Sequence, residues 1–398
     1  MSELIRQRRK EAVKEILRRL HAGESPEKLK AAFREAVGQI SPEEIAAVEE
    51  ELIREGVPRE EIQRLCELHL ALFEESLPQP ELPLPAWHPL RILYAEHEEL
   101  LKMATALARL ARKGIRTEQE KHETRHIIDH LKDSESHYLR EENVLFPYLE
   151  RFGITEPPRI MWMEHDEIRK IKKAILAEGP EGANLADLSL SLSEWLTSHF
   201  TKENRILFPT AFRVIPEGEW PGIRSQFDEI GYCCFTPPAP PAPRAPEKPK
   251  TAEAPRPTAE VRLRFPTGEL TPQEVEAIFN ALPVDITFVD KDDVVRYYSA
   301  TKDRIFVRTP AVIGRKVQDC HPQKSVHVVE RILREFRERK REVAEFWINS
   351  QGKFVYIRYF PVWGQNGEYL GTLEVTQDVA QIRELQGERR LLDEPQGN

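Results

Sequence analysis

The sequence predicts a multidomain protein with an all-α N-terminal domain, a four-helix bundle and a C-terminal α+β domain. Three observations support this. A pair of helical motifs repeats between residues 96 and 203, a proline-rich stretch interrupts the 398-residue chain at 237–258, and strand signals begin beyond residue 259. Because a proline-rich stretch stays extended and builds no core, ordered units are expected on either side of it.

The first 76 residues should form a helical domain. Two Ser-Pro-Glu triplets within it are typical helix starts, with serine as the N-cap and proline in the first turn. The last predicted helix carries Cys66 and His69 on one face, where they could bind a metal or simply pack against a partner. A second proline-rich break at residues 77–88 should link this domain to the bundle.

The bundle is predicted over residues 89–215 because this region contains an internal duplication. Glu96-His97 is repeated as Glu164-His165, and an HxxxE motif followed by Leu-Phe-Pro occurs twice. Residues four apart lie on one face of a helix, so each motif presents its His and Glu together. A proline soon after each motif should end or kink the helix. Helices are expected at 89–112, 117–150, 158–177 and 186–213.

The duplicated motifs predict a site for two metal ions. Imidazole with carboxylate suits iron, manganese or zinc, and four-helix bundles hold carboxylate-bridged metal pairs with such side chains. The repeat also separates Glu141 from Glu142, since Glu203 matches Glu141 while Asn204 stands at the position of Glu142. A duplicated bundle without metal is the alternative. The predicted ligands are His97, His137, Glu141, His165, His199 and Glu203.

Two further histidines lie near the same helical face. His126 and His130 fall close to the face of His137 at about 100° per residue. They could line an entry path or hydrogen-bond the ligands from outside. The alternative is that both are partly exposed near the start of their helix.

The C-terminal region, residues 259–398, is predicted to be α+β. Short runs of β-branched and aromatic residues alternate with helical segments, and turn signals separate the last three runs. This order indicates a five-stranded antiparallel sheet with helices on one side. The predicted helices are 272–281 and 324–338, and the predicted strands are 286–290, 294–299, 341–349, 353–362 and 369–377.

Composition narrows the function classes. The net charge of −9 argues against nonspecific nucleic-acid binding, and no apolar run is long enough to span a bilayer. The four cysteines form no CxxC motif, which fits a reducing compartment without a disulfide framework. We therefore expect a cytoplasmic protein that binds neither nucleic acid nor membrane.

Residues 272–380 resemble a PAS sensor domain. The resemblance rests on Val289-Asp290-Lys-Asp-Asp, on Ile313-Gly314-Arg315 before the long helix, and on the closing Glu-Val-Thr-Gln-Asp-Val of residues 374–379. It implies a small ligand or haem between the sheet and the long helix, and a homodimer. His321 and His327 would be the candidate haem ligands; the alternative is that they hydrogen-bond the loop or line a pocket for a small organic molecule.

Residues 88–213 resemble the hemerythrin-like HHE family. Oxygen carriers of that family have a second His four residues after the third-helix His, where this chain has Arg169. They also have an Asp five residues after the fourth-helix His, where this chain has Asn204 and places Glu203 one residue earlier. The pattern is closer to the di-iron proteins linked to iron–sulfur repair and nitric-oxide stress. That resemblance implies two non-haem irons with open coordination positions.

The whole architecture resembles bacterial and archaeal proteins that join a DUF438 domain, a hemerythrin-like bundle and a PAS domain. The N-terminal resemblance rests on Ser-Pro-Glu-Glu-Ile, Glu-Leu-Ile-Arg-Glu-Gly and Leu-Cys-Glu-Leu-His. Two functions follow as expectations: a di-iron sensor of O2, NO or redox state, or a di-iron enzyme or iron donor in nitrosative-stress defence and cluster repair. No kinase, cyclase or helix-turn-helix signature is present, so output should pass through a protein partner. No catalytic residue stands out.

Overall fold

The computed structural model of the chain describes residues 83–241, 261–302, 304–350 and 352–387, with short stretches between residues 11 and 57. It divides into two compact units, residues 1–244 with 309–312 and residues 245–308 with 313–398. Most described residues between 11 and 57 are helical. Cys66, His69 and most of the proline-rich stretch lie outside the described residues.

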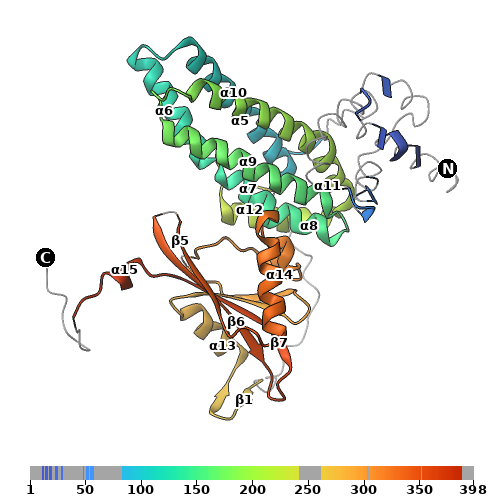
Figure 1. Cartoon of the computed structure of the whole chain (residues 1–398), viewed down its shortest axis with the longest axis vertical. Helices are drawn as coiled ribbons and strands as arrows, with labels where there is room; N and C mark the ends of the chain where they lie inside the picture. The colour runs from blue at the N-terminus through green and yellow to red at the C-terminus, as the bar shows by residue number, and fades with distance from the viewer. Residues whose placement is uncertain are drawn as a thin grey trace. The chain divides into compact units, whose positions relative to one another are not determined.

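Four antiparallel helical segments make up the bundle (Figure 1). Helix α10 packs against α5 and α9, and α6 packs against the same two helices, which closes a ring of four. The predicted four-helix architecture is confirmed. The four segments are α5 (Pro89–Lys113), α6 (Glu118–Asp133), α9 (Glu156–Glu178) and α10 (Leu185–Lys202).

Beyond α6 and α10, the helical chain widens into a π-turn at the same point of each repeat. The Phe146 N–H donates to the Glu141 carbonyl, and the Phe208 N–H donates to the Glu203 carbonyl, each five residues back. The helix continues past the proline in both cases, so neither proline ends it, because the wider turn accommodates a residue without an N–H. The segments are α7 (Glu135–Arg140), η1 (Glu141–Leu145) and α8 (Phe146–Arg151), then η2 (Glu203–Leu207) and α11 (Phe208–Val214).

A further short helix completes this unit. After a 3-10 turn, η3 (Glu217–Glu219), helix α12 (Trp220–Ile230) packs against α5 and α7. Gly231 then ends the helix with a positive φ of 90°, and the chain continues as an irregular segment through residue 241. The Gly231 carbonyl accepts a hydrogen bond from Arg140, so the start of this segment lies beside the end of α7.

Two apolar clusters fill the bundle. One includes Leu93, Val144 and Phe208, and the other includes Leu107 and Phe200. The predicted ligand histidines lie between them: the His97 ring stacks on Phe200 at 3.8 Å between centroids and on Phe208 at 5.3 Å. Polar groups at this level are therefore enclosed by apolar walls, where electrostatic interactions are strong.

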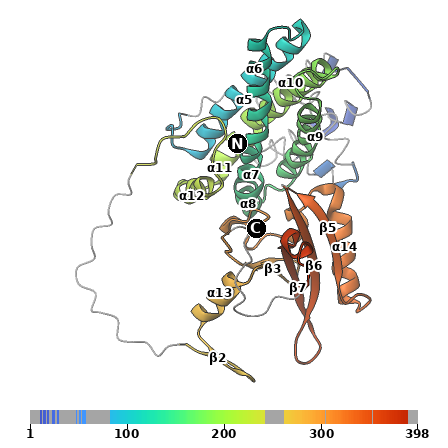
Figure 2. The same cartoon turned by 90° about the vertical axis from the view of Figure 1, so that its left-hand side faces the viewer.

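The second unit is built on a five-stranded antiparallel sheet in the order β4-β3-β7-β6-β5 (Figure 2). The predicted strands and helices are all present, and a short hairpin of β1 and β2 precedes them without having been predicted. The strands are β1 (Leu263–Phe265), β2 (Gly268–Leu270), β3 (Asp285–Asp290), β4 (Val295–Tyr298), β5 (Ala344–Ser350), β6 (Lys353–Trp363) and β7 (Tyr369–Asp378). The helices of this unit are α13 (Pro272–Ala281), the turn η5 (Val317–Cys320), α14 (Gln323–Arg337) and α15 (Ala380–Arg383). The turn η4 (Pro310–Val312) belongs to the first unit.

No helix among the described residues is both long enough and apolar enough to cross a bilayer.

Candidate metal centre

The six predicted ligand side chains meet in the middle of the bundle. They form two sets of four potential metal ligands, and within each set the ligand atoms lie within 4.8 Å of one another. Glu141 and Glu203 belong to both sets, as bridging carboxylates would. All six side chains are at most 1% exposed. The sets are His97, His137, Glu141 and Glu203, and Glu141, His165, His199 and Glu203.

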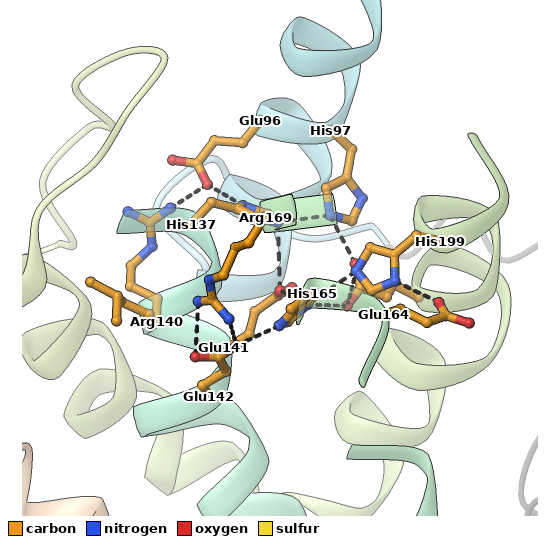
Figure 3. Close-up of polar contacts among 12 residues, drawn as sticks. Glu96, His97, His137, Arg140, Glu141, Glu142, Glu164, His165, Arg169 and His199 are labelled. Atoms are coloured by element: carbon orange, nitrogen blue, oxygen red, sulfur yellow. Dashed lines mark hydrogen bonds and ion pairs between the residues drawn. The ribbon is translucent and has the colours of Figure 1, made fainter. Parts of the chain in front are cut away.

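The four imidazoles turn the same ring atom inward. Nε2 of His97 lies 3.2 Å from Nε2 of His137, and Nε2 of His165 lies 3.1 Å from Nε2 of His199. Each His Nδ1 points outward to an oxygen acceptor at 2.8 Å (Figure 3). An Nδ1 that donates its proton outward leaves an Nε2 lone pair facing the centre, the form in which histidine binds a metal.

The inner carboxylates fit a cation in the same way. Both oxygens of Glu141 and both oxygens of Glu203 are buried and have no hydrogen-bond partner. The nearest imidazole Nε2 atoms lie 3.3 Å or more away. Burial and the charge of Glu203 raise the pKa of Glu141 to about 8. Four facing lone pairs and two unpartnered carboxylates are costly without positive charge, and a pair of metal ions would supply it.

Three of the four outward acceptors are glutamates that are themselves paired with a cation. Glu96 accepts from His137 and from Arg140, and Glu164 accepts from His199 and from Lys202. Burial alone would raise the pKa of Glu96, but its contacts with His137 and Arg140 outweigh this and hold it at about 2. Both glutamates therefore stay ionised and hold the imidazoles in one tautomer and one orientation.

The repeat is broken at the remaining two positions. Glu142 accepts from Nδ1 of His165 and forms a two-pronged ion pair with Arg169, with contacts of 2.6 and 3.1 Å. Asn204 occupies the matching position and contacts Nδ1 of His97. The residue that matches Arg169 in the first repeat is Leu101. The ion pair beside His165 is thus replaced by two neutral residues beside His97, and the two sets of ligand-type side chains are not equivalent.

Sequence reasoning missed the part played by these outer acceptors. Glu96 and Glu164 belong to the repeated Glu-His pair. Each contacts a histidine on another helix, however: Glu96 contacts His137, and Glu164 contacts His199. Of the histidines expected near the ligands, His126 is exposed and His130 is half-buried. Their rings stack on each other with centroids 6.5 Å apart, while the four Nδ1 partners come from elsewhere.

The second unit contains a partly open cavity of about 430 Å³. Its walls come from α14 and the sheet and are mostly apolar, with Val328, Ile332 and Ile357 among them, and Arg308 and Glu374 add charge. His321 also borders the cavity, and its Nδ1 contacts the Val317 carbonyl at 2.8 Å. A volume of this size suits a small organic ligand.

His327 does not lie at this cavity. It is exposed, and the residues of α14 that line the cavity follow a different face, with Ser325, Val328 and Val329 among them. The expectation that His327 holds a ligand in the PAS-like pocket therefore has no support in the geometry. If haem binds in this unit, His321 is the histidine in position to hold its iron.

The site defines a helical-bundle protein with a buried His/Glu centre, joined to a PAS-type sheet, and family models agree with both parts. The hemerythrin HHE cation binding domain matches residues 88–211, the PAS domain matches 275–380, and the family of unknown function DUF438 matches 13–79. The chain thus combines these three domains, as the sequence predicted. A hemerythrin domain implies metal binding, and joined to a PAS domain it suggests a sensor.

Solved structures also show similarity to parts of the chain. A C-terminal domain from Streptococcus mutans is 36% identical, covering 32% of this chain and 98% of that one with a TM-score of 0.31. The PAS domain of a protein from Colwellia psychrerythraea is 13% identical, covering 27% and 97% with a TM-score of 0.23. The PAS domain of BvgS from Bordetella pertussis is 19% identical, covering 28% and 88% with a TM-score of 0.24. No curated protein matches the chain.

The outer glutamates give a prediction about metal affinity. Glu164→Gln removes the charge that orients His199 and leaves Lys202 buried without that partner, so metal affinity should fall about 10–100-fold. Glu167→Gln is the matched control, because the Glu167 side chain on the same helix is 41% exposed and pairs with Lys170. Competition with a chromophoric chelator for Co²⁺ measures both. Equal affinities in the two variants would show that the outer carboxylate plays no such role.

A hemin titration separates the two histidines of the second unit. Because His321 borders the cavity and His327 is exposed, a saturable Soret band should be lost in His321→Ala and retained in His327→Ala. A band lost only in His327→Ala would contradict the placement of these residues. No saturable band in the unsubstituted protein would leave the cavity to a small organic ligand.

Proposed function

We propose that the bundle binds two non-haem iron ions and that the protein senses O2, NO or redox state, with the PAS domain passing the signal to a protein partner. The observation that carries this proposal is the pair of ligand sets that share Glu141 and Glu203. When bound, iron would supply redox-active binding positions for diatomic ligands. Each set offers four side chains, fewer than six-coordinate iron accepts, so positions stay open for a gas.

The chain's own residues supply orientation and exclusion of water. His97 lies flat between Phe200 and Phe208, and Tyr138 and Phe146 contact the His165 ring at 4.7 and 5.8 Å between centroids. These aromatic side chains hold the imidazoles in place and keep bulk water away from the centre. A dry pocket with fixed ligands favours a small uncharged molecule over a charged one.

The PAS domain supports a sensor over a simple carrier. It offers a cavity for a small ligand, and its sheet exposes the apolar side chains of Trp347 and Leu370, which a second copy could cover. A homodimer through this domain is part of the proposal. Ligand binding in the cavity and dimerisation are the two ways in which the PAS domain would pass a change in the bundle to a partner.

The first test of this function is stoichiometry. Protein purified without oxygen after growth in iron-rich medium should contain close to two irons per chain. Glu141→Gln should lose the paired-iron spectrum, because it removes a shared carboxylate. Glu142→Gln should keep the pair but bind it more weakly, because Glu142 contacts the outward Nδ1 of His165 and belongs to neither ligand set. Iron should also be released on acidification, since protons compete for imidazole and carboxylate. Zero iron, or one, would contradict the assignment.

The second test distinguishes a sensor from an enzyme. Iron-loaded protein should take up NO to a fixed stoichiometry, without continued consumption at an NO electrode. Hydrogen exchange in residues 261–387 should change on NO addition in the unsubstituted protein and stay unchanged in Glu141→Gln. Steady NO consumption would instead indicate a di-iron enzyme. Transfer of iron to an apo iron–sulfur protein would indicate the iron-donor function.

A further inference from the structure

Two adjacent cysteines lie together at the edge of the bundle. The Sγ atoms of Cys233 and Cys234 are 3.1 Å apart, and both thiols are free and half-buried. Neighbouring side chains in an extended segment point to opposite sides. The backbone at Cys233 and Cys234 therefore departs from the extended form and brings the two sulfurs together. Adjacent Cα atoms are about 3.8 Å apart, less than the roughly 4.4–6.8 Å of ordinary disulfides. A bond between these two sulfurs would therefore be strained and easily reduced.

The surroundings distinguish the two thiols. The contact with Cys233 and burial raise the pKa of Cys234, so the Cys234 thiol keeps its proton. Lys172 is buried nearby: burial lowers its pKa to about 8, and the charges of Glu135 and Cys233 oppose that shift. In general, positive charge near a cysteine favours the thiolate, which is the nucleophilic form.

A short chain of contacts joins the dithiol segment to a predicted metal ligand. The Gly231 carbonyl, two residues before Cys233, accepts a hydrogen bond from Nη1 of Arg140. The Arg140 guanidinium lies over the Tyr232 ring at 4.7 Å, and its Nη2 contacts Glu96. Glu96 in turn accepts from Nδ1 of His137. The backbone beside the two cysteines thus holds the arginine that fixes the partner of His137.

We propose that Cys233 and Cys234 form a reversible dithiol–disulfide site that reports peroxide to the metal centre. The Cys233 thiolate attacks a peroxide oxygen, the O–O bond breaks, and a sulfenic acid and hydroxide form. The Cys234 sulfur then attacks that sulfenic sulfur, and the S–S bond forms as water leaves. In total, two thiols and one H2O2 give a disulfide and two waters. Closing this bond rotates the segment that carries Gly231 and releases Arg140.

The first experiment tests the chemistry and requires no metal. Full-length protein with Cys66→Ser and Cys320→Ala keeps only the adjacent pair. After H2O2 treatment of the metal-free protein, the peptide that contains both cysteines should lose two hydrogens in mass, and dithiothreitol should restore it. Addition of oxygen atoms instead, or a crosslink between chains, would overturn the site. Because iron is absent, this result is independent of the proposed di-iron function.

The second experiment tests the link to the centre, and it rests on the proposed function. Iron transfer to a chelator should become about tenfold faster after peroxide in the background protein, the size expected when an outer partner of a ligand is lost. Cys233→Ser in that background should show no such change, with its helix content checked by circular dichroism. A disulfide that forms without faster iron transfer would overturn the link.

Discussion

The structure depends on the way that buried negative charge is compensated inside the bundle. Three outer carboxylates, those of Glu96, Glu142 and Glu164, are each paired with a buried or half-buried cation. The two inner carboxylates are not: among residues 83–241 no Lys or Arg lies within 4 Å of Glu141 or Glu203 in an ion pair. Burying an ionised carboxylate without a partner is expensive, so the apolar walls around the centre favour a site that holds cations.

The same contacts explain what the sequence could predict. The duplication placed Glu141 and Glu203 in register, and that comparison alone separated Glu141 from its neighbour Glu142. The four-residue spacing was enough because it depends on the helix itself. The partners of the Nδ1 atoms depend instead on how two helices meet. Glu96 lies beside His97 in sequence but contacts His137, and no spacing within one helix reveals such a contact.

Helix register explains where prediction of the second unit failed. The boundaries of α14 were predicted to within one residue at each end, and the pocket between helix and sheet was expected from the resemblance. Each residue advances the helical face by about 100°, however, so a histidine two residues after a lining position points elsewhere. His327 follows the lining residue Ser325 by two and is exposed, while His321 precedes the helix and borders the cavity. The π-turns were not predicted either, because a proline in the sequence shows only that an ordinary helical turn is interrupted.

The asymmetry between the repeats bears on how such a centre would respond to a ligand. A histidine that donates to a paired carboxylate is a stronger metal ligand than one that donates to an amide, because the outer charge increases its basicity. His165, with Glu142 and Arg169 behind it, is the stronger case, and His97, with Asn204 behind it, is the weaker. The duplicated helices thus provide similar geometry with unequal electrostatics. In the proposed di-iron centre, an incoming ligand would meet less competition from the protein at the His97 position. His97 shares its set with His137, whose outer partner Glu96 is held in place by Arg140.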